Sequence, residues 1–255
     1  MSTNNEGLFG INTLLEALRS GTRGFEKVYV ARGLHGKGVD EIVRTCKALG
    51  IYIHFEGREV IDRLSGTAKN QGVFGVTAAK GYSSVEDILE ISKKRNEKPF
   101  ILILDGVEDP RNLGAIIRTA EGAGVHGIII PKHRSTGLTD VVARTSSGAI
   151  EYVPVAKVTN IAQTIDGLKE RGVWVYGVDM DGEKSYDKLS YSEPLAIVIG
   201  GEGKGIRPLV RKACDETVRI PLHGKVGSLN VSVAAGVVLF EIARQRASLF
   251  PIIKQ

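Results

Sequence analysis

The sequence predicts an α/β protein in which a small mixed domain precedes a larger domain built on a parallel sheet. Its 255 residues are enough for one or two domains of about 150 residues each. Apolar strand-like segments alternate with amphipathic helical segments, and residues 81–98, with eight charged side chains, interrupt them. We therefore expect a first domain over residues 1–80, a linker over residues 81–98 and a second domain over residues 99–255.

The first domain begins with an amphipathic helix, for which Thr13 and Glu16 have the spacing of a capping box and Gly21 supplies the end. The loops 32–38 and 69–72 carry basic or amide side chains, so they either contact phosphates or bases or are solvated turns. The other expected elements are strands at 27–30, 51–55 and 73–77, and helices at 39–49 and 60–64.

The second domain repeats this alternation with longer elements. Continuous apolar strands such as residues 101–104 and 197–199 predict a parallel sheet that is covered on both faces. In sheets of this kind a ligand lies at the carboxyl ends of the strands. The expected strands are 101–104, 127–130, 152–155, 173–178, 195–199 and 218–221, and the expected helices are 113–122, 161–170 and 229–247.

Composition argues against several classes of protein. The apolar segments are too short to cross a membrane and the amino terminus lacks the features of a secretory signal, so we expect a cytoplasmic protein. Cys46 and Cys214 are expected to be small buried residues, and the five histidines lack the spacing of a metal site. The formal charge of +5 weakly favours an anionic partner such as nucleic acid.

The glycine-rich turns do not match the common nucleotide-binding or hydrolase motifs. Residues 201–206 lack the last glycine of the dinucleotide fingerprint, and Val226 stands where a Walker loop needs Ser or Thr. The chain contains no G-x-S-x-G elbow. The glycine loops therefore need another explanation.

Three segments of the second domain supply one: residues 112–118 (NLGAIIR), residues 199–206 (IGGEGKGI), and residues 220–234, which include IPL and SLNVSVA. In this order they resemble the three motifs of the SpoU (TrmH) family of RNA ribose 2′-O-methyltransferases. The resemblance covers the whole chain. Further similarity is to the branch that methylates a guanosine of large-subunit ribosomal RNA, whose amino-terminal RNA-binding domain is like a ribosomal protein and matches residues 1–80.

The resemblance implies a SPOUT-type fold, in which the carboxyl-terminal segment threads a loop of the sheet as a trefoil knot. It also implies a homodimer that binds S-adenosylmethionine in the knot. We expect glycine at positions 200 and 201 because a Cβ there would keep this cofactor from the backbone. By motif position, the residues expected to contact the cofactor are Gly200, Ile220 and Leu229, with Ile199, Gly201, Leu222 and Ser232 nearby.

The reaction implied by the family is methyl transfer from a sulfonium to a ribose 2′-hydroxyl, which requires alignment and a more nucleophilic hydroxyl. The family's central residue corresponds to Arg118. A guanidinium has a pKa above about 12 and is a poor base, so we expect Arg118 to clamp the adjacent phosphate and the hydroxyl. The alternative is a surface arginine paired with Glu121.

The other catalytic candidates are polar residues of the same motifs. The family uses the counterpart of Glu202 to orient the arginine and the nucleotide; the alternative is a solvated turn residue. Ser228 and Asn230 are suited to hydrogen-bonding RNA and cofactor, although Ser228 also has the position of a helix cap. Asn112 is expected to cap the helix that bears Arg118, to contact substrate, or both.

Together with the resemblance, these residues predict an enzyme that methylates the ribose 2′-hydroxyl of a guanosine in large-subunit ribosomal RNA. The alternatives are a transfer RNA methyltransferase, a resistance-type ribosomal RNA methyltransferase, and a non-catalytic RNA-binding assembly factor that retains the fold. The joint presence of Arg118, Glu202, Ser228 and Asn230 disfavours the non-catalytic alternative.

Overall fold

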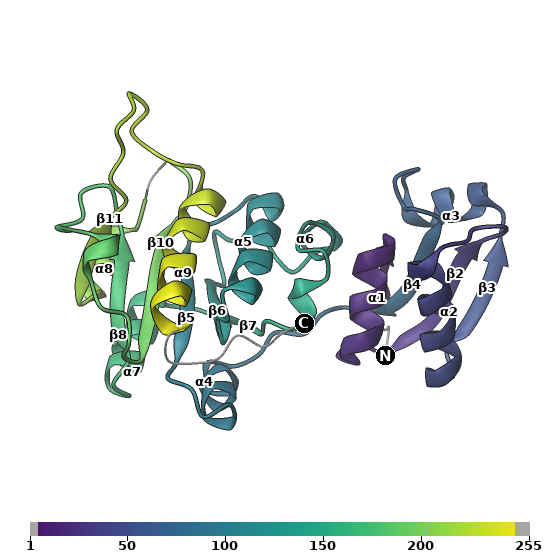
Figure 1. The fold of residues 1–255 in the computed structure, drawn as a ribbon, viewed down its shortest axis with the longest axis horizontal. Coiled ribbons are helices and arrows are strands. Elements are labelled where there is room, and N and C mark those ends of the chain that lie inside the picture. Colours follow the sequence, from purple (N-terminus) through teal and green to yellow (C-terminus); the bar gives the residue numbers. More distant parts are fainter. Residues whose placement is uncertain (1–4, 204, 248–255) are drawn as a thin grey trace. The chain divides into compact units, whose positions relative to one another are not determined.

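The structure, a computed structural model, describes residues 5–203 and 205–247 and divides into two compact units (Figure 1). Lys204 of the glycine-loop motif lies outside the described residues. The first unit comprises Met1–Gly81 with Leu138–Tyr152, and the second comprises Tyr82–Gly137 with Val153–Gln255. The chain therefore passes between the units after residue 81, after residue 137 and after residue 152.

The first unit contains a four-stranded sheet with the strand order β1-β4-β2-β3. β4 is antiparallel to both of its neighbours, whereas β3 is parallel to β2 and forms one edge. The strands are β1 (Asn5–Phe9), β2 (Phe25–Ala31), β3 (Tyr52–Glu56) and β4 (Val73–Ala78). The helices are α1 (Ile11–Ser20), α2 (Lys37–Leu49) and α3 (Arg58–Ser65).

Helix α1 is present, but the predicted capping box at its start is wrong. Gly10, with a φ of 94°, occupies the N-cap position and provides no side-chain cap. Thr13 instead lies inside the first turn, where its side chain is buried. Because glycine adopts this positive φ without strain, the chain enters the helix earlier than the side chains suggested.

Residues 138–152 pack in the first unit through α6 (Asp140–Thr145) and a 3₁₀ turn, Ala149–Glu151. The Glu151 carboxylate is 1% exposed and accepts hydrogen bonds from Arg23 Nε at 2.9 Å, Thr22 Oγ1 at 2.6 Å and Lys80 Nζ at 3.2 Å. Tyr152 adds a hydrogen bond from its hydroxyl to Glu16 Oε2 at 2.6 Å. A buried ionic cluster thus holds this segment against residues 1–81.

The second unit contains a seven-stranded sheet with the order β7-β6-β5-β10-β8-β11-β9. Neighbouring strands of this sheet pair in parallel throughout the described residues, which confirms the predicted parallel-sheet α/β domain. The strands are β5 (Phe100–Asp105), β6 (Gly127–Pro131), β7 (Val155–Val158), β8 (Trp174–Val178), β9 (Lys184–Ser185), β10 (Leu195–Gly200) and β11 (Glu216–Arg219).

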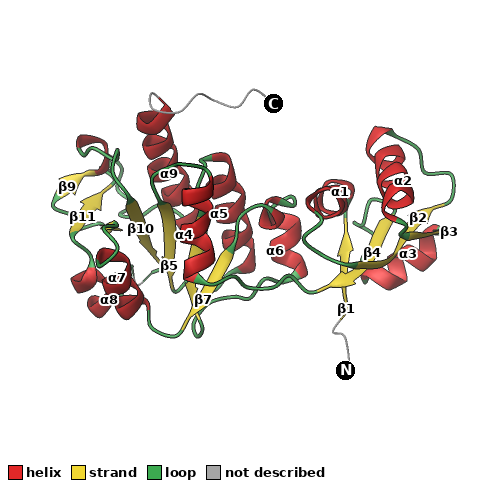
Figure 2. Ribbon diagram, turned by 90° about the horizontal axis from the view of Figure 1, so that it is seen from below, coloured by secondary structure: helices red, strands yellow, loops and turns green. Residues whose placement is uncertain are grey.

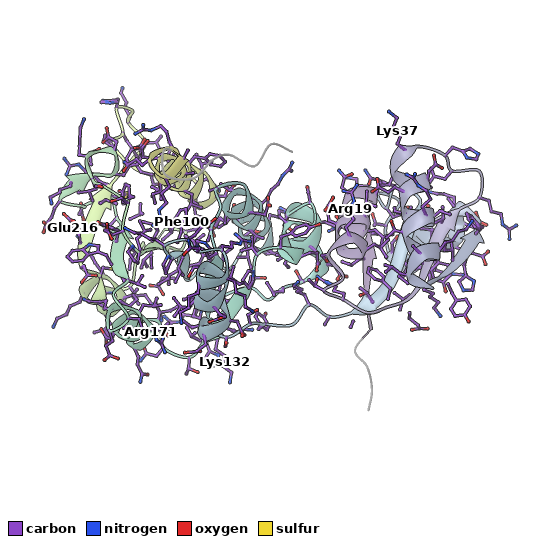
Figure 3. The ribbon with its side chains drawn as sticks, turned by 60° about the horizontal axis from the view of Figure 1, so that its bottom comes forward. Arg19, Lys37, Phe100, Lys132, Arg171 and Glu216 are labelled. Atoms are coloured by element: carbon purple, nitrogen blue, oxygen red, sulfur yellow. The ribbon has the colours of Figure 1, made fainter. Side chains whose placement is uncertain are left out.

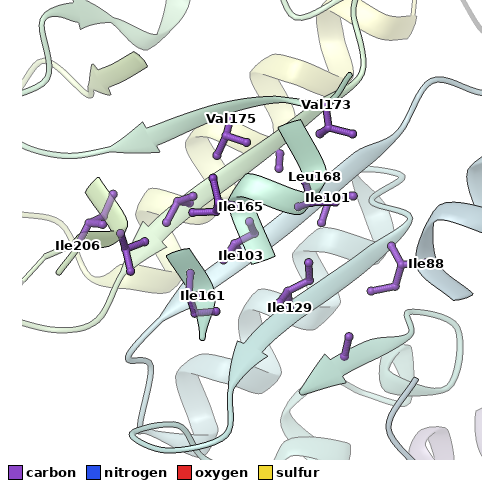
Figure 4. Close-up of a cluster of buried hydrophobic side chains, with 14 residues drawn as sticks. Ile88, Ile101, Ile103, Ile129, Ile161, Ile165, Leu168, Val173, Val175 and Ile206 are labelled. Atoms are coloured by element: carbon purple, nitrogen blue, oxygen red, sulfur yellow. The ribbon is translucent and has the colours of Figure 1, made fainter. Parts of the chain in front are cut away.

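Helices cover both faces of this sheet. One face packs Ile103 and Val198 of the central strands against α7 (Ile161–Lys169) and α8 (Pro208–Ala213), in the cluster of Figure 4. On the other face, α5 (Pro110–Gly122) and α9 (Val231–Ala247) lie side by side (Figures 1 and 2). Every residue of β5 and β10 is buried, as the continuous apolar runs predicted.

The expected linker differs from the structure because residues 85–94 form helix α4 (Val85–Lys94). Ser84 and Asp87 form a reciprocal capping box at its start, and the fully buried Ile88 packs in the core of the second unit. Strand β7 begins later than the predicted strand at 152–155, because residues 149–151 form a 3₁₀ turn. In the described part of the chain, no helix has the length and apolar character needed to cross a membrane.

Candidate functional site

A cavity of about 620 Å³ lies at the carboxyl ends of the central strands of the second unit. The register places Gly200 of β10 opposite Asp105 of β5, and Ile199 opposite Val178 of β8. This is the edge at which parallel α/β sheets bind ligands. The lining comes from the loop after β8, the glycine loop after β10, and the segment that leads from β11 into α9.

Most of the predicted site residues line this cavity. They come from two stretches, residues 199–202 and residues 220–230, so the second and third motifs surround one volume. Asn112, Arg118 and Ser232 are not among the described lining residues. Those that line it are Ile199, Gly200, Gly201, Glu202, Ile220, Leu222, Ser228, Leu229 and Asn230.

Hydrogen bonds between side chains link all three motifs. Asn112 Nδ2 donates to Glu202 Oε1, and Asn230 Nδ2 donates to Asn112 Oδ1 at 3.2 Å. Ser232 Oγ donates to Asn230 Oδ1 at 2.6 Å. Asn112 and Ser232 therefore belong to the polar edge of the cavity through Glu202 and Asn230. We call these four residues the amide chain.

The helix caps differ from two of the expected alternatives. Asp109, rather than Asn112, caps α5, because its Oδ1 accepts from Arg111 N at 2.7 Å. At the start of α9, Asn230 Oδ1 accepts from Ser232 N at 2.9 Å, which is the hydrogen bond of an N-cap residue. Asn112 and Ser228 therefore do not cap these helices, and Ser228 lines the cavity.

The two glycines that begin the glycine loop also have a structural role. A Cβ at Gly200 would lie 2.0 Å from the backbone carbon of Gly205, and a Cβ at Gly201 would lie 2.0 Å from the Gly106 carbonyl oxygen. These atoms belong to the protein, so both glycines are required for close packing of the backbone. The loop also closes on itself through an antiparallel bridge between Gly201 and Gly205.

Arg118 lies on α5, six residues beyond Asn112, and its side chain is exposed. Six residues correspond to about 600° of helical rotation, so the two side chains leave α5 in directions about 120° apart. The structure thus places Arg118 on the helix that carries Asn112, but not in the wall of the cavity.

The loop that follows β8, which belongs to none of the three motifs and was not predicted, contributes Asp179, Met180 and Asp181 to the cavity. Asp179 Oδ1 accepts from Asp181 N at 3.1 Å, and its Oδ2 lies 3.9 Å from Arg211 Nε. With Glu202, the described lining contains three carboxylates and one cation, Arg211. The position of this loop, directly after an apolar strand, was the available signal. The excess of negative charge suits a ligand with positive charge.

Cysteine chemistry lies outside this site. Burial raises the pKa of the Cys46 thiol to about 11 and of the Cys214 thiol to about 12, so both are neutral at physiological pH. Cys46 is buried as expected, whereas Cys214 is only half-buried. Across residues 5–203 and 205–247, no group of His, Cys, Asp and Glu side chains is arranged to hold a metal ion.

Both parts of the chain match known protein families. Residues 99–240 match the SpoU rRNA methylase family, and residues 8–83 match the RNA 2′-O ribose methyltransferase substrate-binding domain. YacO of Bacillus subtilis, of the TrmH family, is 43% identical over 96% of this chain and 98% of its own. The 23S rRNA (guanosine-2′-O-)-methyltransferase RlmB of Shewanella oneidensis is 41% identical over 94% of this chain and 98% of its own.

A solved structure of an rRNA methyltransferase has a similar fold. The crystal structure of the AdoMet-bound rRNA methyltransferase from Sinorhizobium meliloti superimposes with a TM-score of 0.76 at 26% identity, over 95% of this chain and 88% of that one. The family match alone spans more than half of the chain and includes all of the motifs that form the cavity. The chain belongs to the SpoU rRNA methylase family.

Proposed function

We propose that this chain transfers a methyl group from S-adenosylmethionine to the ribose 2′-hydroxyl of a guanosine in large-subunit ribosomal RNA. The observation that carries the proposal is the amide chain, which brings polar residues of all three motifs to one cavity at the carboxyl ends of the strands. The names of the Shewanella RlmB and of the AdoMet-bound Sinorhizobium enzyme support the substrate and the donor, respectively.

The composition of the cavity fits S-adenosylmethionine. Apolar side chains, among them Ile199, Ile220 and Leu229, suit the adenine ring, and Asp179 and Asp181 suit the cationic groups of the molecule. We assign the donor to Gly200, Ile220 and Leu229, with Ile199, Gly201, Leu222 and Ser232 around them. When bound, the donor supplies a methyl group on a sulfonium that is already a good leaving group.

The protein's own contribution is alignment and charge stabilisation. In the proposal, Arg118 binds the phosphate next to the target ribose and stabilises the developing alkoxide, while the proton passes to phosphate or water. The exposure of Arg118 is consistent with a partner that arrives from solution. Glu202, held by Asn112, orients the nucleotide, and Ser228 and Asn230 hydrogen-bond RNA and donor.

A homodimer and a knotted chain complete the proposal. On α9, Val238 and Ile242 are fully buried while the apolar Val233 and Phe240 are about half exposed, so this helix has a second apolar face that a second copy would cover. For the knot, the supporting observation is topological: β10 follows β8 in the chain yet lies between β5 and β8 in the sheet.

The proposal is tested by incubating the protein with methyl-labelled S-adenosylmethionine and unmodified total RNA. Large ribosomal, small ribosomal and transfer RNA are then separated, and alkali-resistant ribose methylation is mapped. We expect label in one guanosine of the large ribosomal RNA, lost in Arg118→Ala. Arg171→Ala is the control, because Arg171 pairs on the surface with Glu86 and lies before β8, at the amino end of the sheet.

Each other outcome has a distinct meaning. Label in transfer RNA alone would show that transfer RNA is the substrate and would leave the proposed mechanism unchanged. Label in no fraction, including precursor ribosomal particles, would favour the non-catalytic assembly factor. Full activity in Arg118→Lys would contradict a role that depends on the planar guanidinium.

A further inference from the structure

A larger cavity, of about 960 Å³, lies within the first unit, and none of its lining residues belongs to the three motifs. Its wall is built from the loop that joins β2 to α2, from the first two turns of α2, and from Phe55 on the edge strand β3. The matched substrate-binding domain includes these residues but does not say where a substrate would lie.

Apolar side chains form one part of the lining of this cavity. Ala31 and Val39 are buried, and Leu34 and Val43 are partly buried beside them. The Phe55 side chain is 51% exposed, although it is aromatic and belongs to a strand. A flat, half-exposed aromatic ring next to aliphatic side chains is a surface on which a planar ring can stack.

Basic side chains form another part of the lining. Arg32, His35, Lys37 and Arg44 all line the cavity. Two contacts hold the Arg32 side chain in place: its Nε donates to the Phe55 carbonyl at 3.0 Å, and its Nη2 lies 3.7 Å from Glu56. Figure 3 shows the Lys37 side chain pointing away from the ribbon at the start of α2.

The carboxylates of the cavity do not cancel this charge. Asp40 and Glu41 also line it, but Glu41 accepts hydrogen bonds from Arg19 Nε at 2.9 Å and Arg19 Nη2 at 2.5 Å. Arg19 is not a lining residue, so Glu41 is neutralised from outside the cavity. Arg32 likewise pairs with Glu56, which does not line the cavity. Two cations, Lys37 and Arg44, then face one remaining carboxylate, Asp40.

We propose that this cavity binds an unpaired nucleotide of the RNA substrate, with the base on Phe55 and the flanking phosphates on Lys37 and Arg44. The inference rests on the proposed function and assigns a second RNA-binding site to the same reaction. Proteins read single-stranded RNA by stacking bases on aromatic rings and by contacting phosphates with Arg and Lys, and this cavity offers both. A paired base would be unable to reach Phe55, so the site favours loops and bulges.

The test measures RNA affinity separately from methyl transfer. The full chain is titrated into a fluorescein-labelled, unstructured RNA dodecamer and into unmodified 23S rRNA transcribed in vitro, at several salt concentrations. Phe55→Leu keeps the apolar bulk but removes the ring, and should weaken binding of the dodecamer about tenfold with an unchanged salt slope. Lys37→Ala combined with Arg44→Ala should weaken binding and reduce the salt slope by about 1.4, which is the value for two single-strand phosphate contacts.

Lys47→Ala is the matched control, since Lys47 is an exposed cation of α2 that does not line the cavity. Its affinity should stay within about twofold of the unmodified protein. Donor binding, measured by calorimetry, should be the same in all variants. Affinities of the cavity variants equal to that of Lys47→Ala would overturn the inference.

Three further outcomes separate this inference from its alternatives. If Phe55→Leu changes the oligomeric state in light scattering while RNA affinity is unchanged, the cavity is a protein interface and the inference is wrong. If the unmodified protein binds the donor but no RNA, the proposed RNA substrate fails together with the inference. Normal methylation of ribosomal RNA with unaltered binding by the cavity variants would overturn the inference alone.

Discussion

Asp105 and Arg207 hold the two ends of the glycine loop together. The Asp105 carboxylate accepts from Arg207 N at 2.9 Å and from Arg207 Nε at 2.7 Å, and its backbone carbonyl accepts from Gly201 N at 2.9 Å. The Asp105 side chain is completely buried, although its partner is 42% exposed. One residue at the end of β5 therefore fixes both the entry and the exit of the loop that walls the cavity.

We predict that Asp105→Asn lowers the free energy of unfolding by about 1–3 kcal/mol, because the new amide group would present hydrogens to the Arg207 guanidinium. Affinity for S-adenosylmethionine should fall as well, since the loop loses its anchor. Urea denaturation and calorimetric titration measure the two effects. Asp166→Asn, at an exposed position on α7, should change stability by less than about 0.5 kcal/mol. Equal behaviour of the two variants would show that the anchor is not needed.

The Glu151 cluster predicts that residues 138–152 are essential to the first unit. Glu151→Ala removes the buried carboxylate that pairs with Arg23, whose side chain is 2% exposed, and loss of one partner of a buried ion pair costs about 3–5 kcal/mol. The expected result is faster proteolysis within residues 1–81 at a low protease concentration. Glu59→Ala, at an exposed position on α3, serves as the control. Indistinguishable cleavage rates would mean that the segment only rests against this unit.

A pH dependence follows from His126. Burial lowers its pKa below the ordinary 6.5, with Arg95 and Arg246 acting in the same direction and Glu97 opposing them. The unfolded chain therefore takes up the proton first as the pH falls, so stability is complete above pH 6.5 and decreases below it, by at most about 1.4 kcal/mol per pH unit. The neutral ring is useful here because its Nδ1 accepts from Phe100 N at 3.0 Å.

Denaturation midpoints between pH 7.5 and 5.5 test this assignment. His126→Gln should lower stability at pH 7.5 and flatten the decrease toward pH 5.5. His223→Gln changes an exposed histidine and should leave the slope as it is. A slope that survives in His126→Gln would assign the pH dependence to carboxylates instead.

The sequence predicted the central elements well because their signals are local. Residues 101–104 and 195–199 are continuous apolar runs, and such runs form buried parallel strands. Residues 85–94 carry two opposing signals: their charges are typical of a linker, whereas Ser84 and Asp87 have capping-box spacing and Ile88 belongs to an apolar stripe. In this segment the periodicity, not the composition, indicates the structure.

Other features had no local signal. Arg23 and Glu151 meet across 128 residues, and nothing near Glu151 indicates that its segment packs with residues 1–81. Asp179 had a weaker signal than the motif residues: periodicity predicted where β8 ends, and only the rule that ligands lie at the carboxyl ends of strands pointed to the loop after it. Motif resemblance identified the glycine loop and the residues before α9, because those motifs are specific in sequence as well as in space.

The glycine loop offers the sharpest distinction between a structural and a ligand-binding role. If Gly201 serves backbone packing, Gly201→Ala forces its Cβ into the Gly106 carbonyl oxygen, 2.0 Å away, and should lower the free energy of unfolding by about 1–3 kcal/mol without any ligand. If glycine were needed only for the approach of the donor, stability would be unchanged and donor affinity alone would fall. Gly224→Ala is the control, because no atom lies within 4 Å of its Cβ position, and it should be neutral in both measurements. Thermal unfolding and donor titration of the two variants decide between these roles, and we expect Gly201→Ala to lose stability first and donor affinity as a consequence.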